Sequence, residues 1–198
     1  PVGSLEGPSV YTPDDLAAGA VPDGPVLVYD FDNYYLGGVI AEHLARSGLT
    51  VTYATPAGHA SAWTIMTNEL PYVHQALERQ GVQVHTMSLL TAFDGATGRL
   101  ENIFTRAPRD LEVRSVVIVG LRLPNDALFH DLEMRRGDWA DAGIRSVTRI
   151  GDALAAGAIV HAVYSGHEFA RGLDAPSVGL YLRDLPIADQ GPAAAYVE

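Results

Sequence analysis

The sequence has no cysteine and no lysine, and it has no long apolar run. Without cysteine the chain cannot by itself hold a disulfide, a thiolate nucleophile or an iron-sulfur cluster. Without lysine, Schiff-base chemistry and a P-loop are excluded. No apolar run approaches the roughly 20 residues of a membrane-spanning helix, and no stretch resembles a signal peptide. We therefore expect a soluble, cytoplasmic protein with no membrane partner.

Positive charge is also scarce. The formal net charge is -11, with 13 basic residues against 24 acidic ones. Such a surface repels phosphates, so we expect small molecules or proteins as partners and no nucleic acid.

The candidate metal and catalytic residues do not combine into a site. His161 and His167 lie six apart on a predicted helix, whereas two ligands on one face need a spacing of three or four. Asp30 and Asp32 lack the further oxygen ligands that a cation requires. No Gly-x-Ser-x-Gly elbow is present. We predict no metal site and no catalytic residue within this chain.

What is present is an alternation of strands and helices, which predicts an α/β fold. Residues 1–24 are rich in Gly, Pro, Asp and Ser and are predicted to be a linker, with one helical turn from Pro13 after a Thr12 cap. The loop-like start without methionine indicates a piece of a longer protein.

A strand-helix-strand unit follows the linker. Val26–Asp30 form a short β-branched run typical of a buried parallel strand, and residues 50–55 form the next. The intervening helix, predicted from residue 37 to Gly48, has an expected buried face of Val39, Ile40, Leu44 and Ala45. This is the size of a βαβ crossover.

The next segments continue the predicted series of strands and helices. In order they are a helix at 68–81 with Asn68 as its cap, a strand at 82–88 and two strands joined by "DGATG" in an antiparallel meander. A strand at 114–122, a helix at 125–135, a strand at 144–152 and a long amphipathic helix at 153–174 come afterwards. We expect the tail from Leu173 to pack on something outside the chain.

The first strand-helix turn departs from a dinucleotide-binding turn. A Rossmann turn uses three glycines for a tight bend, for close approach of the pyrophosphate and for close helix packing. Here those positions fall on Asp30, Asp32 and Tyr35. The acidic residue expected after the second strand is also missing, because Thr55 and Pro56 stand there.

Two interpretations of this turn are open. In the first, residues 25–113 keep the architecture of a dinucleotide domain but have lost its ligand, because carboxylates repel a diphosphate and a tyrosine ring fills its space. In the second, they are an α/β segment that never bound a dinucleotide.

Three blocks resemble one family. They are "YTPDDLAAG", "VLVYDFDNYYLGGVIAEHLARSGLTVTYATPAGHASAWT" and "RIGDALAAGAIVHAVYSGHEFARGLD". They are similar to the C-terminal part of the trimethylamine, dimethylamine and histamine dehydrogenases, flavoproteins of the Old Yellow Enzyme (NADH:flavin oxidoreductase) superfamily.

The resemblance implies a domain plan. Family members begin with a TIM barrel that carries FMN and an iron-sulfur cluster, followed by FAD-like and NAD(P)-like domains, the second inserted into the first. On this plan residues 25–113 are the inserted, Rossmann-like NAD(P)-binding-like domain with its meander. In residues 114–198 the chain leaves the inserted domain and completes a three-layer FAD/ADP-binding-like domain, followed by a tail. Partners would be the barrel and the other half of the FAD-like domain, with self-association as a further option.

The resemblance also implies the cofactors and one site. No cofactor is complete within this chain; FMN and the cluster would lie elsewhere, with ADP or FAD in the FAD-like domain. Gly151, Asp152 and Ala153 match the family's nucleotide-side turn. The alternative is that Asp152 only caps the following helix.

These implications lead to one functional expectation and two alternatives. The chain is expected to be a non-catalytic, nucleotide-binding-like part of an oxidoreductase that oxidises an amine C–N bond on FMN. The first alternative is an NADPH-dependent ene-reductase similar to 2,4-dienoyl-CoA reductase, which would need an intact glycine turn. The second is a stand-alone Rossmann-like binding domain.

Overall fold

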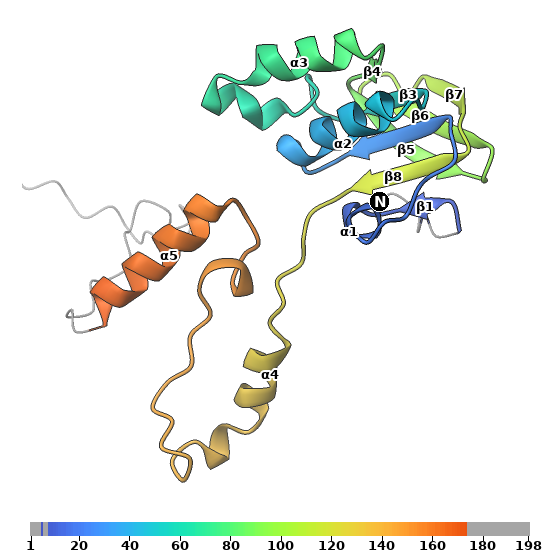
Figure 1. Ribbon diagram of the computed structural model, residues 1–198. Coiled ribbons are helices and arrows are strands. Elements are labelled where there is room, and N and C mark those ends of the chain that lie inside the picture. The colour runs from blue at the N-terminus through green and yellow to red at the C-terminus, as the bar shows by residue number, and fades with distance from the viewer. Residues whose placement is uncertain (1–4, 6–7, 174–198) are drawn as a thin grey trace, which may run out of the picture. The chain divides into compact units, whose positions relative to one another are not determined.

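The computed structural model describes residue 5 and residues 8–173. The chain divides into two compact units, which we call unit 1 (Pro1–Leu121) and unit 2 (Arg122–Glu198) (Figure 1). The predicted packing of the tail from Leu173 falls almost wholly outside the described residues. No helix among residues 8–173 is long and apolar enough to cross a membrane.

Unit 1 contains two sheets, which confirms the predicted α/β class. Its elements are β1 (Val10–Tyr11), α1 (Pro13–Ala17), β2 (Val26–Asp30), α2 (Tyr35–Arg46), β3 (Val51–Ala54), η1 (Ala62–Thr67), α3 (Leu70–Arg79), β4 (Gln83–His85), β5 (Ser88–Phe93), β6 (Thr97–Asn102), β7 (Pro108–Glu112) and β8 (Ser115–Val119). A parallel five-stranded sheet has the order β1-β8-β2-β3-β4, and β5-β6-β7 form an antiparallel sheet.

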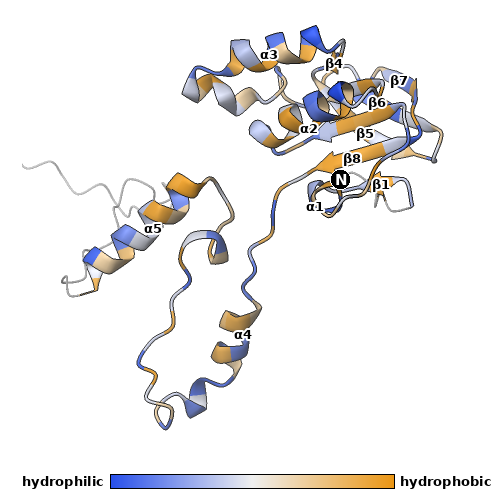
Figure 2. Cartoon of the chain, in the orientation of Figure 1, coloured by the Kyte–Doolittle hydropathy of each residue, from blue (hydrophilic) through white to orange (hydrophobic). Residues whose placement is uncertain are grey.

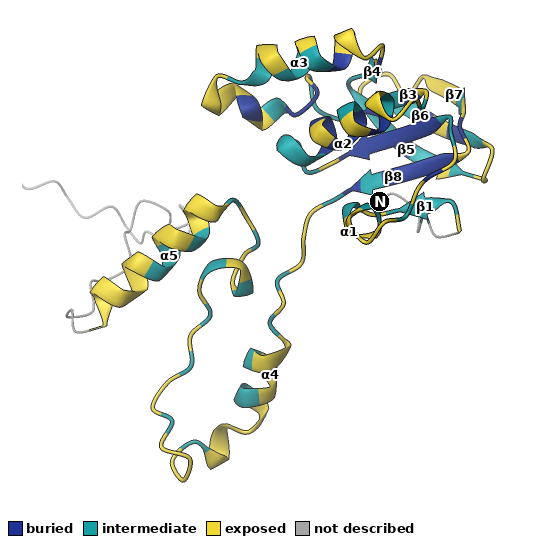
Figure 3. Ribbon diagram, in the orientation of Figure 1, coloured by how far each residue is buried: buried dark blue, intermediate teal, exposed yellow. Residues whose placement is uncertain are grey.

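Side-chain alternation along β2 produces three layers. Val26 and Val28 belong to a core cluster shared with Ile40 and Leu44 of α2, whereas Leu27 packs in a second cluster with residues of β5 and β6. Successive side chains of a strand point to opposite faces, so each residue of β2 is buried on one side or the other. Figure 3 shows β2 as buried throughout and β8 as mostly buried, with intermediate burial near its end.

Part of the predicted linker is structured. The expected turn after Thr12 is α1, where Thr12 Oγ1 accepts a hydrogen bond from the Asp15 N–H at 3.2 Å in a capping box. Just before it, β1 pairs in parallel with β8 through Val10 and Val116. Residues 10–17 are therefore an edge strand and a helix of unit 1.

Unit 1 includes the residues that follow residue 113, up to Leu121. The strand predicted to open the second domain is β8, and it pairs with β2 from Val26 to Asp30. Because β8 lies between β1 and β2, unit 1 continues to Leu121. The meander also has a third strand, β7, that the sequence did not indicate.

Helix α2 differs from its prediction in start and in face. It begins at Tyr35, and Val39, expected in the core, is 56% exposed. Its buried residues are Gly37, Gly38, Ile40, Ala41 and Leu44. The buried stripe is rotated onto the glycines because they let the helix approach the sheet closely. The predicted cap Asn68 is also wrong, since Glu69 precedes α3 and Asn68 ends η1.

Unit 2 has helices but little burial of its own. Its elements are α4 (Ala127–Met134), η2 (Arg136–Asp138), η3 (Gly151–Ala153) and α5 (Ile159–Gly172). The strand predicted at 144–152 does not form, because residues 144–150 have no strand partner within the described part of the chain. Residues 122–173 include no buried residue, as the absence of dark blue along α4 and α5 in Figure 3 shows.

Candidate functional site

The carboxyl end of β2 is where a doubly wound sheet would bind a ligand. The chain runs from β2 to β3 and β4 on one side, and β8 lies on the other. Ligands of open α/β sheets bind in the crevice at such a reversal of strand order. Asp30 is the last residue of β2 and pairs with Val119 of β8, so it stands at this crevice.

Backbone hydrogen bonds close this crevice. The N–H groups of Phe31 and Asp32 both donate to the carbonyl oxygen of Val119, at 2.8 and 3.1 Å. The Asn33 N–H donates to Asp30 Oδ1 at 2.9 Å. In a dinucleotide site, N–H groups of this turn face the phosphates. Here three successive donors are already satisfied within the protein.

Asp30 is the centre of a buried hydrogen-bond network, which we call the Asp30 network. Its carboxylate is fully buried and accepts a short hydrogen bond from the hydroxyl of Tyr53 on β3. The same hydroxyl accepts a hydrogen bond from the Ser61 N–H at 3.0 Å. Thr55 Oγ1 donates to Asn33 Oδ1 at 3.0 Å. Groups of the turn and of β3 therefore bond to one another, whereas the N-cap of α2, Tyr34, makes no side-chain hydrogen bond to the helix.

Asn33 shows how tightly the turn is closed. Its φ of 63° is in the left-handed region, which asparagine tolerates better than most residues. Its carbonyl oxygen accepts from the Trp63 N–H at 2.9 Å, which ties the turn to η1. Thr55, noted for replacing an acidic ribose ligand, contributes to this closure instead.

The close approach of helix and strand is made by Gly37, which the sequence interpretation did not identify. A Cβ on Gly37 would lie 2.5 Å from Asp30 Cγ. Tyr35, assigned to the third glycine position, is the first residue of α2, and its hydroxyl donates a short hydrogen bond to the Glu69 carboxylate. The Gly-Gly pair at 37–38, early in an amphipathic helix, was the signal available in the sequence.

Burial raises the pKa of Asp30 above its ordinary value of 3.8, against the opposing hydrogen bonds from Tyr53 and Asn33. Since the folded state then binds the proton more tightly than the unfolded state, the stability from this group is full below 3.8 and is lost as the pH rises through the folded-state pKa. Ionised Asp30 therefore destabilises the fold relative to the protonated form.

We expect Asp30→Asn to remove this pH dependence. The free energy of unfolding of the variant minus that of the unchanged chain should be most positive at neutral pH and should decrease as the pH falls towards 3.8. Urea titrations at a series of pH values measure it. Asp110→Asn is the control. The hydrogen bond from Arg99 lowers the pKa of Asp110, so the stability difference for this variant should be most negative at neutral pH, the opposite trend. A difference independent of pH for Asp30→Asn would contradict the burial effect.

The predicted nucleotide-side residues Gly151, Asp152 and Ala153 lie together in η3. The Gly151 N–H donates to Ser165 Oγ of α5 at 3.0 Å, and Gly151 has a φ of 55°. Asp152 Oδ1 accepts from the Gly157 N–H at 3.3 Å. The helix expected over 153–174 is α5, which begins at Ile159. The Asp152 contact lies before the N-cap of α5, Ala158, which has no side-chain cap, and nucleotide binding here stays a prediction.

No metal-binding group of three or more His, Asp or Glu residues exists among the residues that the structure describes. His59 and His74 form an edge-to-face ring pair with centroids 5.8 Å apart. Burial lowers the pKa of His74. The two rings therefore pack against each other, and burial favours the neutral form of His74.

The comparisons with known proteins agree with this architecture. Histamine dehydrogenase from Rhizobium sp. 4-9 is 40% identical, with a TM-score of 0.80 over 90% of this chain. The chain is a homologue of the trimethylamine, dimethylamine and histamine dehydrogenase family. The 6-hydroxypseudooxynicotine amine oxidase from Pseudomonas geniculata N1 is 36% identical, with a TM-score of 0.75 over 81% of this chain.

One curated relative gives the same result from sequence. Dimethylamine dehydrogenase from Hyphomicrobium sp. (strain x) is 28% identical over an alignment 186 positions long, which covers 84% of this chain. The chain spans only about a quarter of these relatives, namely 25%, 28% and 24% of their lengths. No family model matches the sequence. These relatives are named as dehydrogenases of amines and as an amine oxidase. The family resemblance expected from the sequence is confirmed.

Proposed function

We propose that the chain is the nucleotide-domain region of a flavin-dependent amine dehydrogenase and has a structural rather than a catalytic role. The observation that supports the enzyme class is the 40% identity to histamine dehydrogenase over 90% of the chain. The observation that supports the structural role is the Asp30 network, which lies at the crevice where a coenzyme diphosphate would bind. Unit 1 is then an NAD(P)-binding-like domain without its ligand.

In the same proposal, unit 2 is the returning part of an FAD/ADP-binding-like domain. Its apolar residues have no cover within the described chain: Ile159 is 83% exposed, and Val163 and Tyr164 of α5 are also exposed. Figure 2 shows apolar residues along α5 in orange. Among the described residues, 144–150 have no partner strand, and α5 exposes apolar side chains. Both features are expected when one half of a sheet-and-helix layer is present without the other half.

The remainder of the enzyme would therefore cover unit 2 and bring the cofactors. The iron-sulfur cluster would be ligated by residues outside this sequence, which has no cysteine. FMN would accept the hydride from the amine in the barrel. ADP or FAD would lie against Gly151, Asp152 and Ala153 of η3, opposite the glycine-rich turn of the other half-domain.

The test uses the complete gene product, with its reading frame extended upstream of Pro1. We expect dimethylamine, trimethylamine or histamine, added without oxygen, to bleach the flavin absorbance, because amine oxidation reduces FMN. NADPH should leave the absorbance unchanged, since the N–H groups of the turn after β2 already bond within the protein. The measurement is the visible spectrum before and after each addition.

Other outcomes would identify the alternatives. Bleaching by NADPH would contradict the proposal and support an ene-reductase similar to 2,4-dienoyl-CoA reductase. A reading frame that begins here and encodes no barrel would support a stand-alone Rossmann-like domain. A flavoprotein bleached by neither would overturn the amine dehydrogenase assignment.

A further inference from the structure

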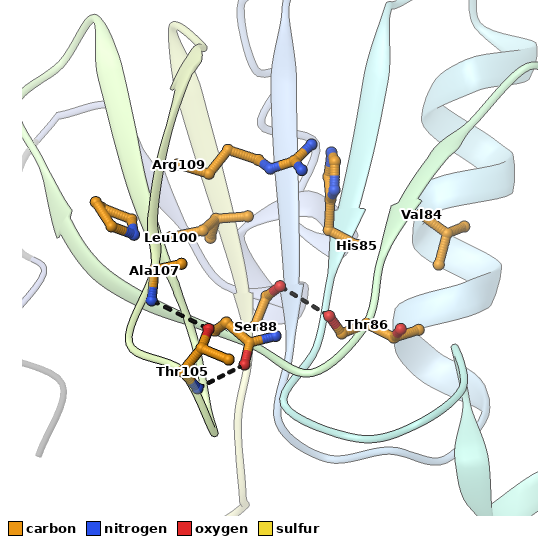
Figure 4. Close-up of a pocket in the computed structure, with 10 residues that line it drawn as sticks. Val84, His85, Thr86, Ser88, Leu100, Thr105, Ala107 and Arg109 are labelled. Carbon is orange, nitrogen blue, oxygen red and sulfur yellow. Dashed lines mark hydrogen bonds between the residues drawn. The ribbon is translucent and has the colours of Figure 1, made fainter.

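A polar pocket of unit 1 lies next to β4, two strands along the parallel sheet from β2. It has a volume of about 390 Å³ and lies between β4 and the strands β6 and β7 of the meander. Its polar lining residues are His85, Thr86, Ser88, Asn102, Thr105 and Arg109, and Leu100 contributes an apolar wall. Figure 4 shows the side chains of Arg109 and His85 on the same side of the pocket.

His85 has an unpartnered polar atom at this pocket. Its Nε2 is buried and has no hydrogen-bond partner among the residues described. Burial and, to a smaller extent, the positive charge of Arg109 lower the pKa of His85. An unpaired buried nitrogen is costly, so it indicates a partner that is not part of the chain.

Arg109 has a positive charge without an internal counter-ion. No carboxylate within the described part of the chain forms an ion pair with it, although the chain has nearly twice as many acidic as basic residues. The neighbouring strand shows the contrast, because Arg99 on β6 pairs with Asp110 at 2.8 Å. Figure 4 shows the Arg109 side chain extended towards the His85 ring.

The other polar groups can complete a binding site. Ser88 Oγ donates to the Thr86 carbonyl at 2.8 Å, so its oxygen is held at the pocket wall. Asn102 Oδ1 accepts from the Phe104 and Thr105 N–H groups, both at 3.0 Å, which leaves its amide N–H₂ as a donor. A guanidinium, an imidazole and an amide N–H₂ are all suitable donors to one negatively charged group.

We propose that this pocket binds a small oxyanion, a carboxylate or a phosphate group, through Arg109 and His85. The guanidinium supplies two parallel donors, which matches the planar fork of either group. His85 Nε2 supplies the third donor when it carries the proton. The pocket belongs to unit 1 alone, so this inference does not depend on the proposed amine dehydrogenase activity.

The experiment titrates the 198-residue chain with inorganic phosphate and, separately, with succinate, at constant ionic strength in chloride. We expect one of the two, or both, to shift the imidazole NMR signals of His85 with saturation in the millimolar range. Binding should also raise the pKa of His85, because an anion stabilises the imidazolium. A response to phosphate alone or succinate alone identifies the group that the pocket prefers.

Variants decide whether the site is the proposed one. Arg109→Gln, at an exposed position that should not affect folding, is expected to weaken binding by roughly tenfold or more, since it removes a charged donor. The matched control is Arg79→Gln at the exposed end of α3, which removes the same charge and should change nothing.

Three results would overturn the proposal. The first is that neither anion shifts the His85 signals, and the second is that the shifts grow without saturation. The third is that Arg79→Gln weakens binding as much as Arg109→Gln. The first would indicate a pocket filled by water alone. The other two would indicate a general effect of salt on an acidic protein.

Discussion

Tyr53→Phe is expected to lower the free energy of unfolding of unit 1 by about 3 kcal/mol. The variant keeps the ring in the core but removes the hydroxyl that donates to Asp30 and accepts from the Ser61 N–H. The Ser61 N–H would then be buried without a partner, and the Asp30 carboxylate would keep only the hydrogen bond from the Asn33 N–H. Urea unfolding at neutral pH, followed by circular dichroism, measures the loss.

Tyr72→Phe is the matched control, because Tyr72 is 71% exposed on α3. It should leave the stability unchanged. The pKa of Asp30 should rise further in Tyr53→Phe, since one of the two hydrogen bonds that stabilise the charged form is lost. Equal effects of the two variants would show that the Tyr53 hydroxyl does not hold the Asp30 network together.

Gly37→Ala is expected to destabilise unit 1 by about 2 kcal/mol, although alanine is the better helix former. The new Cβ would lie 2.5 Å from Asp30 Cγ and 2.6 Å from Asp30 Oδ2. The carboxyl group cannot turn away without breaking its bonds to Tyr53 and Asn33. Helix α2 must therefore move off the sheet. The measurement is the same urea titration.

Gly166→Ala is the control for this change, because a Cβ at Gly166 of α5 meets no atom within 4 Å. It should not lower the stability of unit 1. Gly37→Ala combined with Asp30→Ala should recover part of the loss, since the clash with the carboxyl group disappears. A stabilising Gly37→Ala would mean that α2 does not approach β2 as closely as the structure shows.

The order of elements was largely readable from the chain. The β-branched run at Val26–Asp30 and the run at Ser115–Val119 became adjacent parallel strands, because continuous apolar runs are what strands buried on both faces require. The pairing of β8 was not readable. Whether β8 pairs with β2 or opens a new sheet depends on partners far away in sequence, and no local pattern contains them.

The departure from a glycine turn was visible in its residue types, but the structure of the turn was not. Asp30 was expected to repel a diphosphate, and the structure gives it two internal donors and full burial. The sequence interpretation also assigned the third glycine position to Tyr35, whereas Gly37, two residues later, makes the close approach. Counting from the strand cannot show which residue of the helix meets the sheet.

The amino-acid sequence alone determined which chemistry this chain cannot perform by itself, most of the strands and helices of unit 1, and to which dehydrogenases the chain is related. Those properties depend on residue types and on periodicity along the chain. Only the tertiary structure decided that Tyr53 and Asn33 satisfy Asp30, that β8 completes the first sheet, and that Arg109 lies beside the unpartnered His85. Those features are contacts between residues distant in sequence, and their hydrogen bonds are fixed only when the layers pack.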